Sequence, residues 1–282
     1  MSTASPTSLL ADLPDSVLWS SRPWTHFATL PKARRPLVVL PIFGFADWGL
    51  GRSLDLEETL GCGVLRAMFA SDPDRAASTL VLPPLRFVLG PYPHTFFGID
   101  FETALDLVRE IAASVLASGS SRLVLFNTSP WNEELAKLCA CDLRVDLGLR
   151  TYVVHLAALG LDLHPTRSSV RAAVQAAACA LTRRAPSDDV PRGDSRLIDF
   201  RPGDHRQPPP LTWTKSLDAA VTEGWTTLAN AGARLARLLA EIDGLPGLAP
   251  REPATRARTS TGPSAKRTRR TKESRTTRRP SS

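Results

Sequence analysis

Residues 35–42 read RPLVVLPI, a short and continuous apolar run that ends just before Gly44. A strand that is apolar on both faces is typical of the interior of a parallel sheet. Three more runs of the same kind follow along the chain, at residues 79–82 (TLVL), 122–126 (RLVLF) and 151–155 (TYVVH). We therefore predict a sheet built from these four buried strands.

Segments with the apolar spacing of helices lie between these runs, at residues 57–69, 101–117 and 131–145. A further segment, residues 217–242, repeats apolar residues at spacings of three and four and predicts a last helix that packs on the body. Parallel neighbours need crossover connections, and the crossover helices cover the sheet. The predicted fold class is therefore α/β, with a mainly parallel sheet and helices on both faces.

The chain has 282 residues. At about 150 residues per domain, this length allows one large domain or two small ones. We predict one domain at residues 24–245, preceded by an N-terminal extension at residues 1–23. Residues 183–210 are polar and rich in proline, which predicts an excursion with little regular structure. Residues 246–282 form a basic tail that we expect to be disordered.

The net charge of +7 comes entirely from the end of the chain. Residues 251–282 hold eleven Lys or Arg against two Glu, so the remaining residues are slightly acidic. The segment has too little apolar surface to offset the entropy of ordering it. Two interpretations stay open: the tail binds nucleic acid or an acidic partner through its cations, or it is a solvated extension.

Membrane insertion and export are not indicated by this sequence. No stretch approaches the length of about 18 apolar residues that spans a bilayer, and the first residues lack a basic and then apolar signal. The four cysteines (Cys62, Cys139, Cys141 and Cys179) show no metal-binding spacing. We predict a cytoplasmic protein with reduced thiols and no membrane partner.

Residues 40–59, LPIFGFADWGLGRSLDLEET, resemble the creatininase family of metal-dependent amidohydrolases, which act mostly on cyclic or small amides. In that family a buried strand ends in P-x-G-S-x-E-Q-H-G-P-H-L-P, followed shortly by T-D, and Pro41 and Gly44 match the strand end. The resemblance extends over residues 24–242 in the order and spacing of the elements. It implies a three-layer αβα domain and, as is usual in the family, a ring-shaped homo-oligomer.

The first family motif is altered where the family binds metal. Asp47 occupies the place of the ligand Glu, and Gly49 occupies the place of a ligand His. Glu57 and Glu58 stand where the family has Thr and Asp. The resemblance therefore implies that Asp47 and Glu58 keep ligand charge while one imidazole is gone.

A second motif, N-G-H-G-G-N in the family, is altered in the same way. Asn127 and Asn132 match its first and last residues within SSRLVLFNTSPWNEEL. Ser129 replaces the second ligand His, and Trp131 replaces an acidic ligand of some members. Ser129 followed by Pro130 also suits a helix start, so a capping role is the alternative.

The family's chemistry needs two divalent ions that share a carboxylate, lower the pKa of a bound water and polarise the amide carbonyl. With both imidazoles replaced, we predict that this two-ion site is lost and that no cofactor is bound. The leading hypothesis is a non-catalytic binding or scaffold protein, with no catalytic residue assigned.

The alternative hypothesis is a metal-dependent amidohydrolase acting on a small or cyclic amide through a rebuilt, mononuclear site. Zinc or manganese would then be held by Asp47 and Glu58, with a carboxylate from Glu133 or Glu134. Both of the last two residues also suit the first turn of a helix, where negative charge is favourable. We expect the pocket to be lined by residues from three loops: Trp48, His94, Asn127, Ser129, Trp131 and Asn132.

Overall fold

The long strands of the chain pair in parallel and form one central sheet. The computed structural model describes residues 13–30, 35–48, 50–90, 95–164, 168–186 and 215–245. The sheet has the order β3-β1-β8-β9, with bounds Thr79–Val81 for β3, Leu37–Phe43 for β1, Arg122–Asn127 for β8 and Arg150–His155 for β9. A two-residue strand, β4 (Leu85–Arg86), also pairs in parallel with β1. The predicted mainly parallel sheet is confirmed.

Strand β1 is the centre of this sheet, and all seven of its residues are buried. Its register pairs Val39 with Val81 on one side and with Val124 on the other. Because successive side chains of a strand point to opposite faces, a strand that is apolar at every position can pack helices on both faces.

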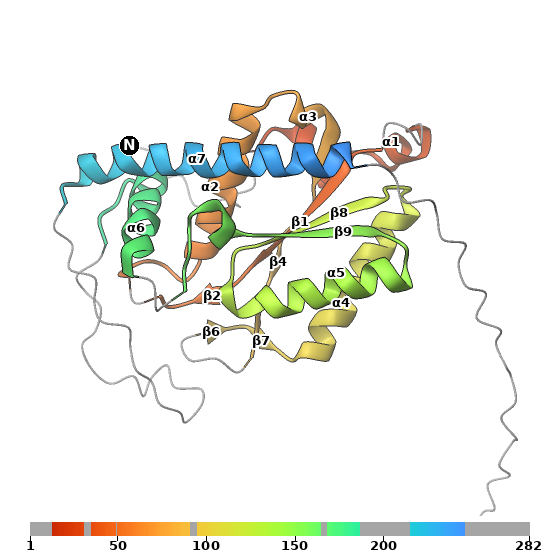
Figure 1. Ribbon diagram of the computed structural model, residues 1–282, viewed down its shortest axis with the longest axis horizontal. Coiled ribbons are helices and arrows are strands. Elements are labelled where there is room, and N and C mark those ends of the chain that lie inside the picture. Colours follow the sequence, from red (N-terminus) through yellow and green to blue (C-terminus); the bar gives the residue numbers. More distant parts are fainter. Residues whose placement is uncertain are drawn as a thin grey trace, which may run out of the picture. The chain divides into compact units, whose positions relative to one another are not determined.

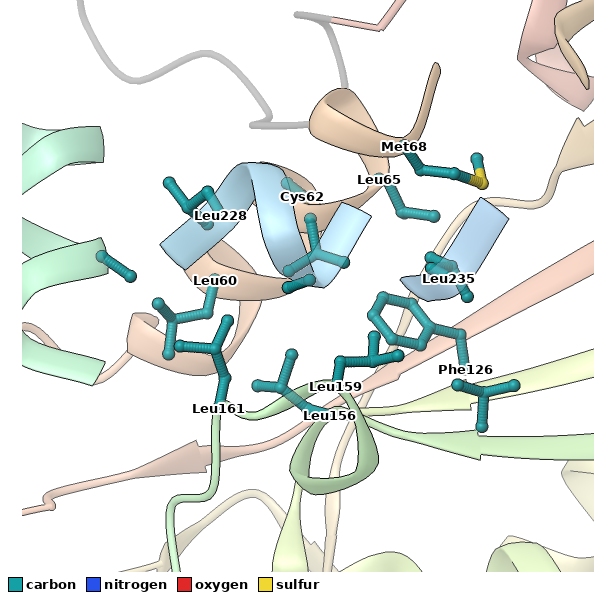
Figure 2. Close-up of a cluster of buried hydrophobic side chains, with 14 of the residues drawn as sticks. Leu60, Cys62, Leu65, Met68, Phe126, Leu156, Leu159, Leu161, Leu228 and Leu235 are labelled. Carbon is teal, nitrogen blue, oxygen red and sulfur yellow. The ribbon is translucent and has the colours of Figure 1, made fainter. Parts of the chain in front are cut away.

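The first face of the sheet is covered by α2 (Leu56–Ser71), α6 (Ser168–Thr182) and α7 (Leu217–Gly244). Side chains of β1 that point this way include Val39 and Phe43. A short 3-10 turn, η6 (Leu156–Leu159), completes this layer after β9. Figure 2 shows leucines of α2, α7 and η6 packed around Phe126 of β8.

The second face is covered by α4 (Phe101–Ala117) and α5 (Glu133–Asp146), which lie on the opposite side of the sheet from α7 (Figure 1). Val38, Leu40 and Ile42 of β1 point to this side. Helix α4 begins where Asp100 accepts a hydrogen bond from the backbone N–H of Thr103 at 2.9 Å. Helices on both faces give the three-layer αβα arrangement.

Several short elements were not expected from the sequence. They are the helices α1 (Trp24–Thr29) and α3 (Arg75–Ser78), the 3-10 turns η2 (Asp15–Val17), η3 (Trp19–Ser21) and η5 (Pro130–Asn132), and the strands β2 (Phe45–Ala46), β5 (Val88–Leu89), β6 (Thr95–Phe96) and β7 (Gly98–Ile99). Strands β2 and β6 pair antiparallel, and β5 and β7 pair parallel. Strands of two residues are too short to show a period in the sequence.

Part of the predicted N-terminal extension belongs to the core of the domain. Leu13 and Val17, which lie in the predicted extension 1–23, are buried in the first-face core. The excursion 183–210 is described only as far as residue 186, and residues 246–282 lie outside the described residues. No helix among the described residues has both the length and the apolar character that a bilayer crossing requires.

Candidate functional site

The carboxyl ends of β1, β8 and β9 meet at one edge of the sheet, which is where ligands bind in open parallel sheets. Gly44 follows β1, while Asn127 and His155 are the last residues of β8 and β9. The first turn of α2 brings Glu57 and Glu58 to the same edge. Both carboxyls are buried, although α2 begins with acidic residues that sequence alone would place in solvent.

Glu57 is the most enclosed of these groups, with no exposed surface. Its Oε2 accepts hydrogen bonds from the backbone N–H of Gly44 at 2.8 Å and from the hydroxyl of Thr128 at 3.1 Å. A side chain at Gly44 would place its Cβ 2.7 Å from this oxygen, so the close approach requires glycine. Burial raises the pKa of Glu57 to about 7, and the donors around the carboxyl only partly oppose this effect.

Two further donors face the Glu57 carboxyl. The hydroxyl of Ser129 and the indole N–H of Trp48 both act to lower the pKa of Glu57. By strict geometry, however, Ser129 Oγ, Trp48 Nε1 and Glu57 Oε1 are buried without a hydrogen-bond partner among the described residues. We therefore regard these contacts as electrostatic rather than as formed hydrogen bonds.

Ser129 lies at the start of a helical turn, as its alternative role predicted. It directly precedes η5, with Pro130 at the first helical position. Its side chain makes no capping hydrogen bond, however. The hydroxyl is directed to the acid of α2 instead, so the capping interpretation holds for the backbone only.

Glu58 forms a bidentate ion pair with Arg86 of β4. The guanidinium donates from Nε to Oε2 at 2.7 Å and from Nη2 to Oε1 at 2.6 Å. The Glu58 side chain is 8% exposed, against 39% for Arg86, so the carboxylate is the more buried partner. The bond to Glu58 raises the pKa of Arg86 above its usual value. Asp47, which follows β2, is half-buried.

His155 is a site residue that the sequence analysis missed. The amide of Asn127 donates to the backbone carbonyl of Ser129 at 2.7 Å and lies 3.2 Å from His155 Nδ1. Because Asn127 Oδ1 accepts from the N–H of Ser129, the amide NH2 faces the ring and Nδ1 is the acceptor. Burial lowers the pKa of His155, and the carboxylate of Glu133 opposes this shift. The sequence did contain one indication of this role, because His155 is the last residue of the predicted strand 151–155 and so lies at the ligand-binding edge of the sheet.

The other predicted site residues take different positions. Glu134 is exposed and pairs with Lys137 at 2.7 Å. Asn132 accepts from the N–H of Leu89 at 2.9 Å and donates to the carbonyl of Phe87 at 2.8 Å, so its amide ties the start of α5 to the backbone around β5. His94 lies outside the described residues.

The two tryptophans of the site are stacked on each other. The rings of Trp48 and Trp131 have centroids 6.2 Å apart and are inclined by 7°. Trp48 is buried, while Trp131 is partly exposed. The pair packs between the loop after β2 and the turn η5, so it joins the two altered family motifs.

The described residues do not fit a two-ion metal site of the kind that the family resemblance implies. In the part of the chain that the structure describes, no group of three His, Cys, Asp or Glu is placed to hold a metal ion. Both oxygens of the Glu58 carboxylate are bound by a guanidinium, and Oε2 of Glu57 already accepts two hydrogen bonds. The groups that surround these two carboxyls are N–H and O–H donors, which bind a carboxyl by hydrogen bonds and are poor ligands for a cation.

No protein-family model matches the sequence. No curated protein matches it either.

Solved structures show what the chain is similar to in three dimensions. A creatininase mutant complexed with creatine superposes with a TM-score of 0.57 at 17% identity, over 81% of this chain and 99% of that one. A creatinine amidohydrolase (creatininase) also gives 0.57 at 18% identity, over 83% and 100%. A manganese creatininase gives 0.56 at 18% identity, over 80% and 98%. At these identities the likeness establishes the fold, and this chain therefore has the creatininase-like αβα fold that its sequence motifs predict.

Proposed function

We propose that this protein is a creatininase-like binding or scaffold protein that does not hydrolyse amides. The observation that carries the proposal is the bidentate pair between Glu58 and Arg86. Glu58 stands where the family has a ligand, and both of its oxygens are bound by a fixed cation. A divalent ion would have to break two charge-assisted hydrogen bonds and approach a guanidinium of like charge.

The environment of Glu57 supports the same proposal. Burial raises the pKa of this carboxyl to about 7, so near neutral pH it is protonated in a large part of the molecules. A metal ligand has to be deprotonated, and a protonated carboxyl competes poorly for a cation. Gly44 and Thr128 also donate hydrogen bonds to Oε2 of this carboxyl.

The test is the metal content of the purified protein, free of any tag, before and after incubation with zinc and with manganese. We expect no stoichiometric metal and no rise in Tm, because an ion that binds only the native state has to stabilise it. Arg86→Met is the informative variant, since it removes the guanidinium from Glu58. Stoichiometric zinc or manganese in the wild type, lost in Glu58→Ala, would overturn the proposal.

A metal-dependent amidohydrolase is the second candidate, and one observation favours it. The imidazole of His155 lies at the same edge as Glu133, close enough for that carboxylate to shift its pKa. A mononuclear site would combine this part of the edge with Asp47 and Glu58. The same experiment separates the two candidates: turnover of small or cyclic amides that chelation abolishes, and that Asp47→Ala removes, supports the enzyme.

A further inference from the structure

The central sheet has two edge strands, and the described residues cover only one of them. On the β3 side, Leu18 of the N-terminal segment forms a parallel bridge with Val81 and so extends the sheet. On the other side, β9 pairs with β8 and with no other strand among the described residues. An uncovered edge strand presents a row of unpaired N–H and C=O groups, which readily pair with another strand.

The free backbone groups of β9 belong to every second residue. The N–H of Arg150 donates to the carbonyl of Ser121 at 3.1 Å, which is the β8 side. Thr151 faces the opposite side, because its carbonyl accepts from Nε of Arg144 at 2.7 Å. By the same alternation Val153 also faces away from β8. No described residue forms a hydrogen bond with the N–H or the carbonyl of Val153, so both groups are available to an added strand.

Helix α5 packs along β9 and runs in the opposite direction (Figure 1). The carboxylate of Glu133, its first residue, acts on the pKa of His155 at the end of β9, whereas Arg144 reaches Thr151 near the start of β9. Eleven residues, or about three helical turns, separate Glu133 from Arg144, so both lie on the same side of α5. Neither forms a salt bridge with another described residue. The open edge therefore has a carboxylate at one end and a guanidinium at the other.

We propose that the β9 edge is an interface with a second copy of this chain, which adds its own β9 as an antiparallel strand. The same edge of two copies meets about a two-fold axis, and this axis makes the two strands antiparallel. With the axis at Val153, Val153 pairs with the partner's Val153, and Tyr152 lies opposite the partner's Val154. Aromatic and β-branched pairs across strands stabilise a sheet.

The charges beside the edge favour a second copy as the occupant. The two-fold axis brings the start of β9 in one copy to the end of β9 in the other. Arg144 therefore approaches the partner's Glu133, and this contact occurs twice. Opposite charges that meet in this way fix the register and the orientation of an interface. The inference goes beyond the proposed function and does not depend on it, because an enzyme and a scaffold could both assemble through this edge.

The first test is light scattering of the full-length protein over a series of concentrations. We expect a dimer, or a larger assembly built from dimers. Glu133→Arg is expected to raise the Kd of the dimer at least about tenfold, because both ion pairs become contacts between like charges. Combining Glu133→Arg with Arg144→Glu restores opposite charges and is expected to restore the dimer. Glu110→Arg makes the same charge change at an exposed position of α4 and is the matched control.

The second test locates the axis by a disulfide between copies. In a Cys141→Ser background, which removes the exposed thiol, Val153→Cys is expected to cross-link two chains when diamide is added. Directly opposite residues of an antiparallel pair have Cα atoms about 5.5 Å apart, which is within the reach of a disulfide. Glu110→Cys in the same background is the control and is expected to stay uncross-linked. An unchanged circular dichroism spectrum shows that each variant is folded.

A wild type that is monomeric at every concentration would overturn the inference, since another occupant, such as residues 187–214 or a different protein, would then cover the edge. An oligomer that keeps its Kd in Glu133→Arg and does not cross-link through Val153→Cys would overturn it as well. Neither result bears on metal content or amide hydrolysis, so failure of this inference is distinguishable from failure of the proposed function.

Discussion

The carboxyl of Glu57 is fully buried, and this burial makes the free energy of unfolding depend on pH. Its pKa is raised from 4.5 to about 7 in the folded protein. As the pH rises, Glu57 therefore ionises in the unfolded state before it ionises in the folded state. The contribution of Glu57 to the free energy of unfolding is fully present below pH 4.5 and is lost as the pH rises to about 7. This loss is of the order of 3 kcal/mol at 1.36 kcal/mol per pKa unit. We expect Glu57→Gln to remove this part of the pH dependence and to be the more stable form at pH 8.

Urea unfolding of the wild type and of Glu57→Gln between pH 5 and pH 8 measures this effect as the free energy of unfolding. Glu134→Gln is the control, because Glu134 is exposed and lies in the first turn of α5. Wild-type and Glu57→Gln profiles that run parallel over this range would show that the carboxyl is not buried as described.

The location of the candidate site could be predicted from the sequence, but its internal pairing could not. Strand ends and motif spacing pointed to the edge that holds Glu58 and Ser129. The partner of Glu58 is Arg86, 28 residues away on a two-residue strand that shows no period. Adjacent helix residues also point about 100° apart, so sequence does not show which of Glu57 and Glu58 faces the sheet.

At the scale of elements, the contact between α6 and α7 depends on glycine. A Cβ at Gly224 would lie 2.0 Å from the backbone oxygen of Ala176. We expect Gly224→Ala to lower the free energy of unfolding by about 1–3 kcal/mol, as is typical when a methyl group is forced into a packed core. Urea unfolding measures the change.

Gly244→Ala is the matched control, because a Cβ there meets nothing within 4 Å. It lies at the last residue of the same helix. Equal stability of the two variants would mean that α6 and α7 do not approach as closely as the structure shows.

Elements with strong apolar contrast could be predicted, and elements without it could not. The predicted strands and the helices at residues 57–69, 101–117 and 217–242 agree with the observed β1, β3, β8, β9, α2, α4 and α7. Helix α5 begins two residues later than predicted, because η5 precedes it. The sequence analysis did not predict helix α6, because its buried positions are mostly alanine, which gives little hydrophobic contrast.

At the scale of the whole molecule, the basic residues are concentrated at residues 251–282, outside the predicted α/β domain. Binding of nucleic acid, if it depends on charge, is therefore a property of this segment and not of the fold. We expect deletion of these residues to remove salt-dependent binding to nucleic acid, since the rest of the chain is slightly acidic. Fluorescence anisotropy with a single-stranded oligonucleotide at two salt concentrations measures it. A full-length protein that does not bind would favour the solvated extension, and a truncated protein with the same salt dependence would contradict the tail model.

The family resemblance also implies a homo-oligomer, and this stays a prediction. The described residues set out the fold of one chain, and the creatininase-like likeness covers most of it. Light scattering of the full-length and truncated proteins gives the assembly size in both forms.

The position of α7 has a consequence for how the protein is made. Residues 217–244 cover α2, which was synthesised about 150 residues earlier, and the core between them holds Leu60, Leu65 and Leu235 (Figure 2). Until α7 leaves the ribosome, this side of α2 has no cover. The nascent chain therefore exposes apolar surface during most of its synthesis, and completion of the fold waits for its last helix.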